Sequence, residues 1–131
     1  MTYATPLIGL IYIIIAYLLT EDNAKYLLSG YNTMTHEERK KFNMKAFIPY
    51  FKKFHIFLGI STIMLGLLIN ILINNKASII ALALYSISAY IYFIIKSNRF
   101  YIDEPPISSK LALIFLSIIL VFLTVIIIYN Y

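Results

Sequence analysis

The sequence GYNTMTHEERKK, residues 30–41, is the longest polar interval in a chain that is otherwise mostly apolar. One apolar segment precedes this interval, and further apolar segments follow it. Apolar residues make up 61% of the 131 residues and charged residues only 13%, whereas about 25% of residues are charged in a soluble domain. A water-soluble globule has no way to bury so much apolar surface. The sequence therefore predicts a single all-α integral membrane domain over residues 1–131.

We expect four transmembrane helices, at about residues 4–20, 54–73, 78–95 and 111–129. A helix needs about 20 apolar residues to cross a bilayer, and the first of these segments is the weakest. This segment lacks the positively charged region and the cleavage site of a signal peptide, so we expect it to be retained. Only the polar turn at Asn74, Asn75 and Lys76 separates the second segment from the third, which predicts an antiparallel hairpin.

The polar interval contains its own signals for local structure. Gly30 predicts the end of the preceding helix, because glycine adopts the left-handed conformation of a helix C-terminus at little cost. Thr35 and Glu38 have the T-x-x-E spacing of a capping box, in which each side chain accepts a hydrogen bond from the other residue's amide. We therefore expect a basic interfacial helix from Thr35 to about residue 48, broken, kinked or restarted at Pro49.

The distribution of Lys and Arg predicts how the chain is oriented in the membrane. Seven lie between the first and second apolar segments and three between the third and fourth, whereas only Lys76 lies on the opposite side. Positively charged loops of membrane proteins stay in the cytoplasm. We therefore expect residues 30–48 in the cytoplasm and both termini outside, in a bacterial cytoplasmic membrane.

The sequence also argues against several kinds of catalytic and binding site. It contains no cysteine, which excludes disulfides, thiolate metal sites and cysteine nucleophiles. The apolar segments contain no Asp, Glu, Lys or Arg, which argues against a pump driven through buried carboxylates. His36 and His55 have no carboxylates at metal-ligand spacing, and we expect His36 in the first turn of a helix and His55 at the membrane interface. The sequence thus favours a non-enzymatic protein with no metal, no cofactor and no nucleic-acid partner.

Three groups of residues are candidates for binding. The first is a motif loop with its capping glutamate, which either shapes a turn or holds an anion or an acidic partner group: Gly30, Tyr31, Asn32, Thr33, Thr35 and Glu38. The second is a helix-packing face of small residues: Gly59, Thr62 and Gly66. The third consists of basic residues that either follow the topological charge bias or bind lipid headgroups: Arg39, Lys40, Lys41, Lys52 and Lys53.

The stretch KYLLSGYNTMTHEE, residues 25–38, resembles a family of small bacterial integral membrane proteins of unknown function. The hallmark of that family is a GYNTMS-like motif after the first membrane helix, and Thr35 stands where the family has serine. The resemblance implies a membrane location and no particular activity. A more distant likeness is to the immunity proteins that protect bacilli from the Sdp killing factor, which carry a G-[YI]-R-T motif. Gly30, Tyr31 and Thr33 match that motif, and Asn32 replaces its arginine.

These observations favour a small membrane protein that acts by interaction, in an immunity-like manner, within the lipid bilayer. The partner would be another membrane protein or a second copy of the chain, contacted through the small-residue face or through the motif loop. The alternative is a subunit of an oligomeric channel or transporter. Its polar lining would then be Asn70, Ser86 and Ser88.

Overall fold

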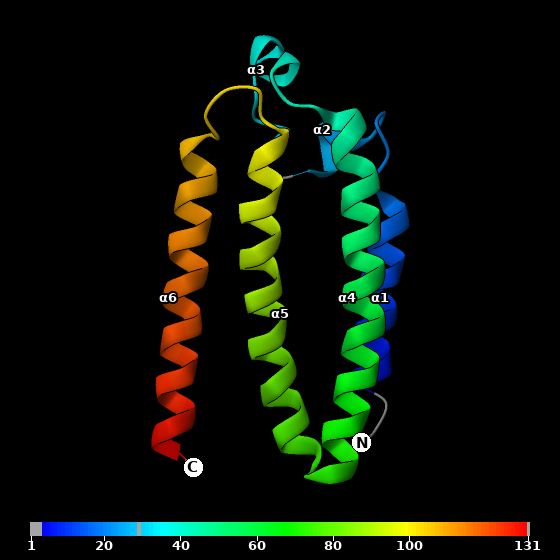
Figure 1. Ribbon diagram of the computed structural model, residues 1–131, viewed down its shortest axis with the longest axis vertical. Helices are drawn as coiled ribbons and strands as arrows, with labels where there is room; N and C mark the ends of the chain where they lie inside the picture. Colours follow the sequence, from blue (N-terminus) through cyan, green and yellow to red (C-terminus); the bar gives the residue numbers. More distant parts are fainter. Residues whose placement is uncertain (1–3, 29, 131) are drawn as a thin grey trace.

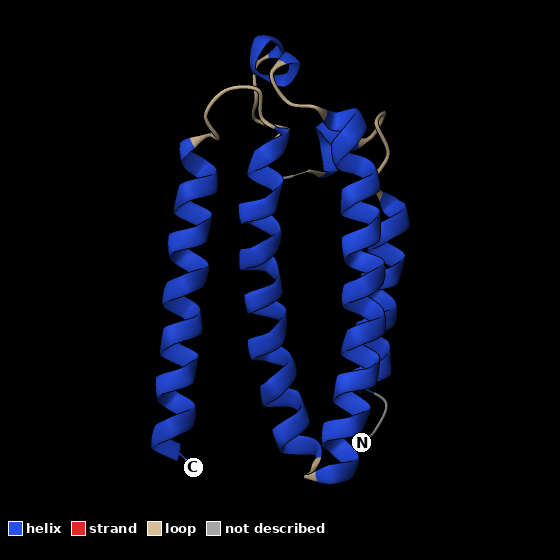
Figure 2. Ribbon diagram, viewed as in Figure 1, coloured by secondary structure: helices blue, strands red, loops and turns tan. Residues whose placement is uncertain are grey.

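The computed structural model describes residues 4–28 and 30–130. Within these residues the chain is helical apart from its connections and one isolated bridge between Phe42 and Tyr101 (Figures 1 and 2). The elements are α1 (Ala4–Leu18), α2 (Ala24–Leu27), α3 (His36–Lys40), α4 (Met44–Leu72), α5 (Asn75–Ser97), η1 (Asn98–Phe100) and α6 (Ile107–Asn130). The predicted all-α class is confirmed.

Three helical segments are long and apolar enough to cross a membrane: Met44–Leu72, Asn75–Phe100 and Ile107–Asn130. Each is longer than the about 20 residues that a crossing needs, and they mark the chain as a membrane protein. The remaining apolar helix, α1, has only 15 residues. At 1.5 Å per residue it is about 22 Å long, shorter than the about 30 Å hydrocarbon core of a bilayer.

The connections between the long helices gather at the two ends of the bundle (Figure 1). α4 and α5 form the predicted hairpin, and Asn74 caps α5 by accepting a hydrogen bond from the Ala77 amide at 2.8 Å. The opposite end carries α2, α3, η1 and the loop before α6. We call this end the head and define it as the described residues within 19–43 and 98–106.

The small residues of α4 pack against other helices of the same chain. Gly59 and Thr62 are buried, and a Cβ on Gly59 would collide with the backbone of α1. Gly66 lies against Thr5 of α1, and its carbonyl accepts a hydrogen bond from the buried Ser78 hydroxyl of α5 at 2.7 Å. In contrast, α6 packs on α5 and has no buried residue.

The expected bounds of the interfacial helix are wrong. The helix that begins after Thr35 ends at Lys40 instead of residue 48, and a new helix begins at Met44. Residues 41–43 are held outside a helix because Asn43 N–H donates to the Phe100 carbonyl and Ile102 N–H donates to the Lys41 carbonyl, both at 2.8 Å. Asn43 then caps α4 through Oδ1, which accepts from the Ala46 amide at 3.1 Å.

Of the three effects expected of Pro49, a break and a restart are excluded because α4 continues through it to Leu72, and a kink stays a prediction. The ring removes one amide donor, and the carbonyl that loses its helical partner is that of Lys45, in the first turn of α4. This position lies beside the polar head. The structural cost of the proline is therefore smaller there than in the centre of a membrane helix.

Candidate functional site at the head of the bundle

The motif loop, residues 30–35, is a turn stabilised by local hydrogen bonds. Gly30 has a φ of +87°, the left-handed conformation expected of it. The Thr33 hydroxyl donates to the Gly30 carbonyl at 2.9 Å, and the Asn32 amide donates to the Leu28 carbonyl at 3.1 Å. The preceding helix, α2, already ends at Leu27. The side chains of Asn32 and Thr33 are exposed on the outside of this turn.

The predicted capping box at the start of α3 is confirmed. The Glu38 amide donates to the Thr35 hydroxyl oxygen at 3.3 Å, and the Thr35 amide donates to Glu38 Oε2 at 2.7 Å. The Thr35 hydroxyl also donates to the same carboxylate oxygen at 2.9 Å. Because the backbone amide and the hydroxyl of Thr35 both favour the charged carboxylate, they lower the pKa of Glu38.

Arg39 holds the motif loop from the next turn of α3. Its Nε donates to the Tyr31 carbonyl at 3.2 Å, and its Nη2 donates to the Asn32 carbonyl at 3.1 Å. The guanidinium also lies over the Tyr31 ring, 5.4 Å from the ring centroid. The sequence suggested Arg39 as a lipid-headgroup contact. In the structure, Nε and Nη2 bind two adjacent loop carbonyls, a fork geometry that arginine supplies and lysine does not, and a headgroup contact of the remaining donors stays a prediction.

The segment that follows α3 is joined to the loop between α5 and α6. Phe42 and Tyr101 form an antiparallel bridge, and their rings pack edge to face with centroids 4.7 Å apart. Next to them, Lys41 Nζ lies 2.7 Å from Asp103 Oδ2, and this partner raises the pKa of Lys41. Sequence reasoning missed this junction, because nothing local marks a pairing between residues so far apart in the chain.

Aromatic side chains form the core of the head. The Phe42 ring lies between those of Tyr31 and Phe47, at centroid distances of 5.7 and 5.2 Å. The buried members of this cluster are Leu19, Ala24, Phe42, Phe47, Phe93 and Phe100. Tyr31 thus has a structural role in the motif loop, since its ring packs on the core while its carbonyl accepts from Arg39.

The remaining basic candidates, all lysines, have different neighbours. Lys40 Nζ pairs with Glu37 Oε1 at 2.8 Å on the exposed side of α3. Lys52 Nζ lies 4.2 Å from the centroid of the Tyr17 ring, at the end of α1. Lys53 is exposed. Exposed pairs of this kind contribute little to stability, and a headgroup contact of these lysines stays a prediction.

His55 lies inside the bundle, with only 2% of its surface exposed, and its expected level at the membrane interface stays a prediction. Its Nδ1 lies 2.8 Å from the Phe51 carbonyl and its Nε2 lies 3.2 Å from the Tyr90 hydroxyl. A carbonyl only accepts, so Nδ1 carries the proton and Nε2 accepts from Tyr90. The histidine thereby links α4 to α5. His36, by contrast, is exposed in the first turn of α3, as expected.

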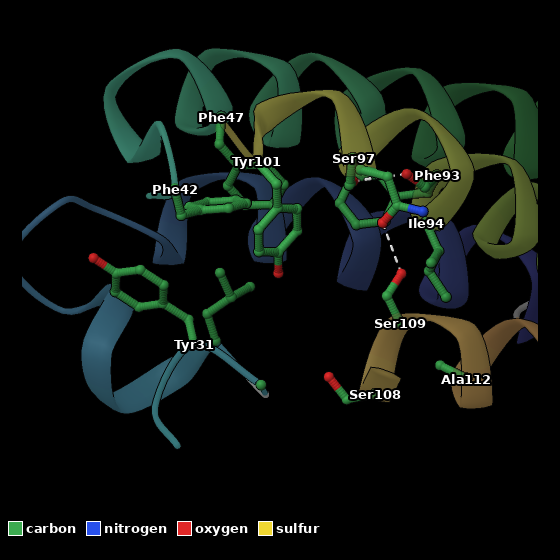
Figure 3. A pocket seen from close by; sticks show the side chains of 13 residues that line it. Tyr31, Phe42, Phe47, Phe93, Ile94, Ser97, Tyr101, Ser108, Ser109 and Ala112 are labelled. Carbon is green, nitrogen blue, oxygen red and sulfur yellow. Dashed lines mark hydrogen bonds between the residues drawn. The ribbon is translucent and has the colours of Figure 1, made fainter. Parts of the chain in front are cut away.

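A cavity of about 310 Å³ lies between the head and the adjoining ends of α5 and α6 (Figure 3). Aromatic rings from the core form one part of its wall: Phe42, Phe47 and Phe93. Polar, uncharged side chains form another part: Ser97, Asn98, Ser108 and Ser109. Tyr31 and Tyr101 complete the wall on the side of the motif loop, and burial raises the pKa of Tyr101. Its phenol is therefore neutral near pH 7.

The polar residues suggested as a channel lining lie apart from this cavity. Ser88 is exposed and donates to the Leu84 carbonyl of its own helix at 2.8 Å. Ser86 lines a mostly apolar crevice of about 380 Å³ between α1 and α5, together with Thr5 and Tyr12. Asn70 is half-buried near the far end of α4. Ser86 and Ser88 thus have separate surroundings within the bundle.

These features define a small helical membrane protein with a folded polar head at one end of its bundle. Among the described residues, no three His, Cys, Asp or Glu side chains gather into a metal-binding group. The chain belongs to a family described as a domain of unknown function (DUF3784), whose model matches residues 7–101. The match includes the motif loop, Arg39 and Tyr101, and it stops before α6. Searches of curated proteins and of solved structures found no match.

Proposed function

We propose that this protein is a non-enzymatic membrane protein that binds another membrane component through its head. The observation that carries the proposal is the presentation of Asn32 and Thr33. Both side chains are exposed, while Arg39 binds the backbone carbonyls of Tyr31 and Asn32 and so holds the turn in place. A loop held in one conformation loses less entropy on binding than a flexible one, so such a turn is suited to recognition.

The head is a better interaction surface than the small-residue face. Gly59 is covered by α1, Gly66 is covered by α1 and α5, and Thr62 is fully buried. A partner would have to displace α1 to reach them. Lys40 and Lys41 of the head are exposed and add a positive surface suited to anionic headgroups or an acidic partner.

The proposal includes a topology with four spans, in which α1 also crosses, and with the head in the cytoplasm of a bacterial cell. The charge distribution supports it, because ten of the eleven Lys and Arg lie on the head side of the bundle and Lys76 on the other. Asn32→Cys and Asn75→Cys test it in this cysteine-free chain. A membrane-impermeant thiol reagent applied to intact cells should label only Asn75→Cys. Labelling of Asn32→Cys alone would reverse the orientation.

Co-purification from native membranes tests the interaction itself. Asn32→Ala is the informative variant, because the structure uses only the Asn32 backbone in the turn: its amide donates to Leu28 and its carbonyl accepts from Arg39. The substitution should therefore remove a contact surface and leave the loop intact. Lys53→Ala, a change at another exposed head-side residue, is the matched control.

We expect the wild type and Lys53→Ala to recover the same partner, and Asn32→Ala to recover much less of it. Recovery of the protein alone in every case would contradict the proposal. A partner that is a second copy of the chain would appear as a dimer with the same dependence on Asn32. An immunity-like role predicts that the partner is a membrane-acting toxin and that cells producing Asn32→Ala lose protection from it.

A further inference from the structure

The cavity beneath the motif loop lies at the boundary between the membrane helices and the head. Ile94 and Ala112 in its wall belong to helical segments of membrane-spanning length. Tyr31 and Tyr101 on its other side belong to the polar head (Figure 3). In a bilayer this level is the interfacial layer, where the glycerol and ester groups of lipids lie. An occupant must therefore be compatible with an apolar and a polar environment at once.

The hydrogen-bonding groups of the cavity favour an uncharged occupant that accepts hydrogen bonds. No Asp, Glu, Lys or Arg is among the described residues that line it. The Ser109 hydroxyl donates to Asn98 Oδ1 at 2.7 Å, so the amide oxygen of Asn98 already has a donor and its NH2 group is the part that is left to bind an occupant. No described residue accepts from these hydrogens or from the Tyr101 hydroxyl, which points into the space above Ser108 in Figure 3. The site thus offers donors beside aromatic rings.

We propose that this cavity binds the ester-bearing glycerol segment of a membrane lipid, together with the first part of one acyl chain. Ester carbonyls are uncharged acceptors and match the Asn98 amide and the Tyr101 hydroxyl, while the chain packs on Phe47 and Phe93. A cavity of about 150 Å³ holds benzene, so the 310 Å³ here holds a segment of about twice that size and not a whole lipid. The charged headgroup stays outside, near the lysines of the head. This inference does not depend on the partner proposed above.

Photolabelling in phosphatidylcholine nanodiscs tests the proposal. The two probes are a diester phosphatidylcholine with a diazirine next to the ester, and its diether analogue, which lacks the ester carbonyls. We expect the ester probe to label peptides covering residues 93–98 and 108–112 about three- to tenfold more than the ether probe, the factor that corresponds to one hydrogen bond. Unlabelled diester lipid should compete for this labelling in a saturable way.

Variants separate the cavity from the general lipid layer. Ala112→Trp fills the cavity and should abolish the ester preference. Tyr101→Phe keeps the ring that packs on Phe42 and removes one donor, so it should reduce the preference even if the tryptophan variant does not fold. Ser117→Trp, a similar change at an exposed site farther along α6, should leave it unchanged. Equal labelling by both probes, or labelling that neither cavity variant alters, would overturn the proposal.

Discussion

Gly9 of α1 and Gly59 of α4 face each other where neither position has room for a side chain. A Cβ on Gly9 would lie 2.6 Å from the Gly59 carbonyl oxygen, and a Cβ on Gly59 would lie 2.5 Å from the Gly9 carbonyl oxygen. The two helices therefore meet backbone to backbone. This close approach increases the dispersion contact between them, which replaces the hydrophobic effect as a source of helix association in lipid.

Gly59→Ala should loosen the contact between α1 and α4, because its methyl group would collide with the α1 backbone. We expect a loss of about 1–3 kcal/mol in the free energy of unfolding, the usual cost of overpacking a close contact. Unfolding in mixed detergent micelles, followed by circular dichroism, measures it. Ile60→Leu, at the neighbouring and 49% exposed position, is the control. Equal stability of the two variants would show that the helices do not pack through Gly59.

Arg39→Lys should free the motif loop while keeping the positive charge. A lysine ammonium does not reproduce the fork that binds the Tyr31 and Asn32 carbonyls together. Hydrogen exchange of the amides of residues 31–35 should become several-fold faster. Lys40→Arg changes the adjacent residue, whose ion pair with Glu37 is exposed, and should leave this exchange unaltered. Unchanged exchange in Arg39→Lys would show that Arg39 does not hold the loop in its conformation.

The capping box should make the start of α3 sensitive to acid. The Thr35 amide and hydroxyl lower the folded-state pKa of Glu38 below 4.5. The stabilisation is therefore complete above the unfolded-state pKa and is lost as the pH falls through the lower, folded-state pKa. Carboxyl NMR titration measures the shift directly. Thr35→Val should move the Glu38 pKa part of the way back to its ordinary value, because the backbone amide still donates. An ordinary Glu38 pKa in the wild type would contradict the capping box.

The bond between His55 and Tyr90 should appear in a double-mutant cycle. Tyr90→Phe leaves the buried Nε2 of His55 without its donor, and we expect it to cost about 1–3 kcal/mol of unfolding free energy. His55→Phe with Tyr90→Phe removes both polar partners, so the double variant should cost less than the sum of the single variants. Tyr92→Phe, at a 54% exposed position of the same helix, is the control. Strictly additive costs would mean that the two side chains do not interact.

Much of the fold was predictable because its signals are local or compositional. The lengths of the apolar segments predicted the long helices, and the position of Asn74 predicted their hairpin. The Thr35 and Glu38 pair predicted the start of α3, and Gly30 predicted a left-handed turn. Each of these features depends on one continuous segment of the chain, so the sequence carries the necessary information in one place. The membrane class was predictable from the same apolar segments.

The sequence by itself thus determined the long apolar segments and the capping box that begins α3. Only the tertiary structure decided what those elements contact. The bridge to Tyr101 ends α3 early, Tyr90 draws His55 into the bundle, and α1 covers the small-residue face of α4. The reason is physical: a cap or an apolar run lowers the free energy within one segment, whereas these contacts exist only after distant segments pack together. The cavity under the motif loop arises in the same way, from four separate parts of the chain: residues 28–31, 42–47, 93–101 and 108–112.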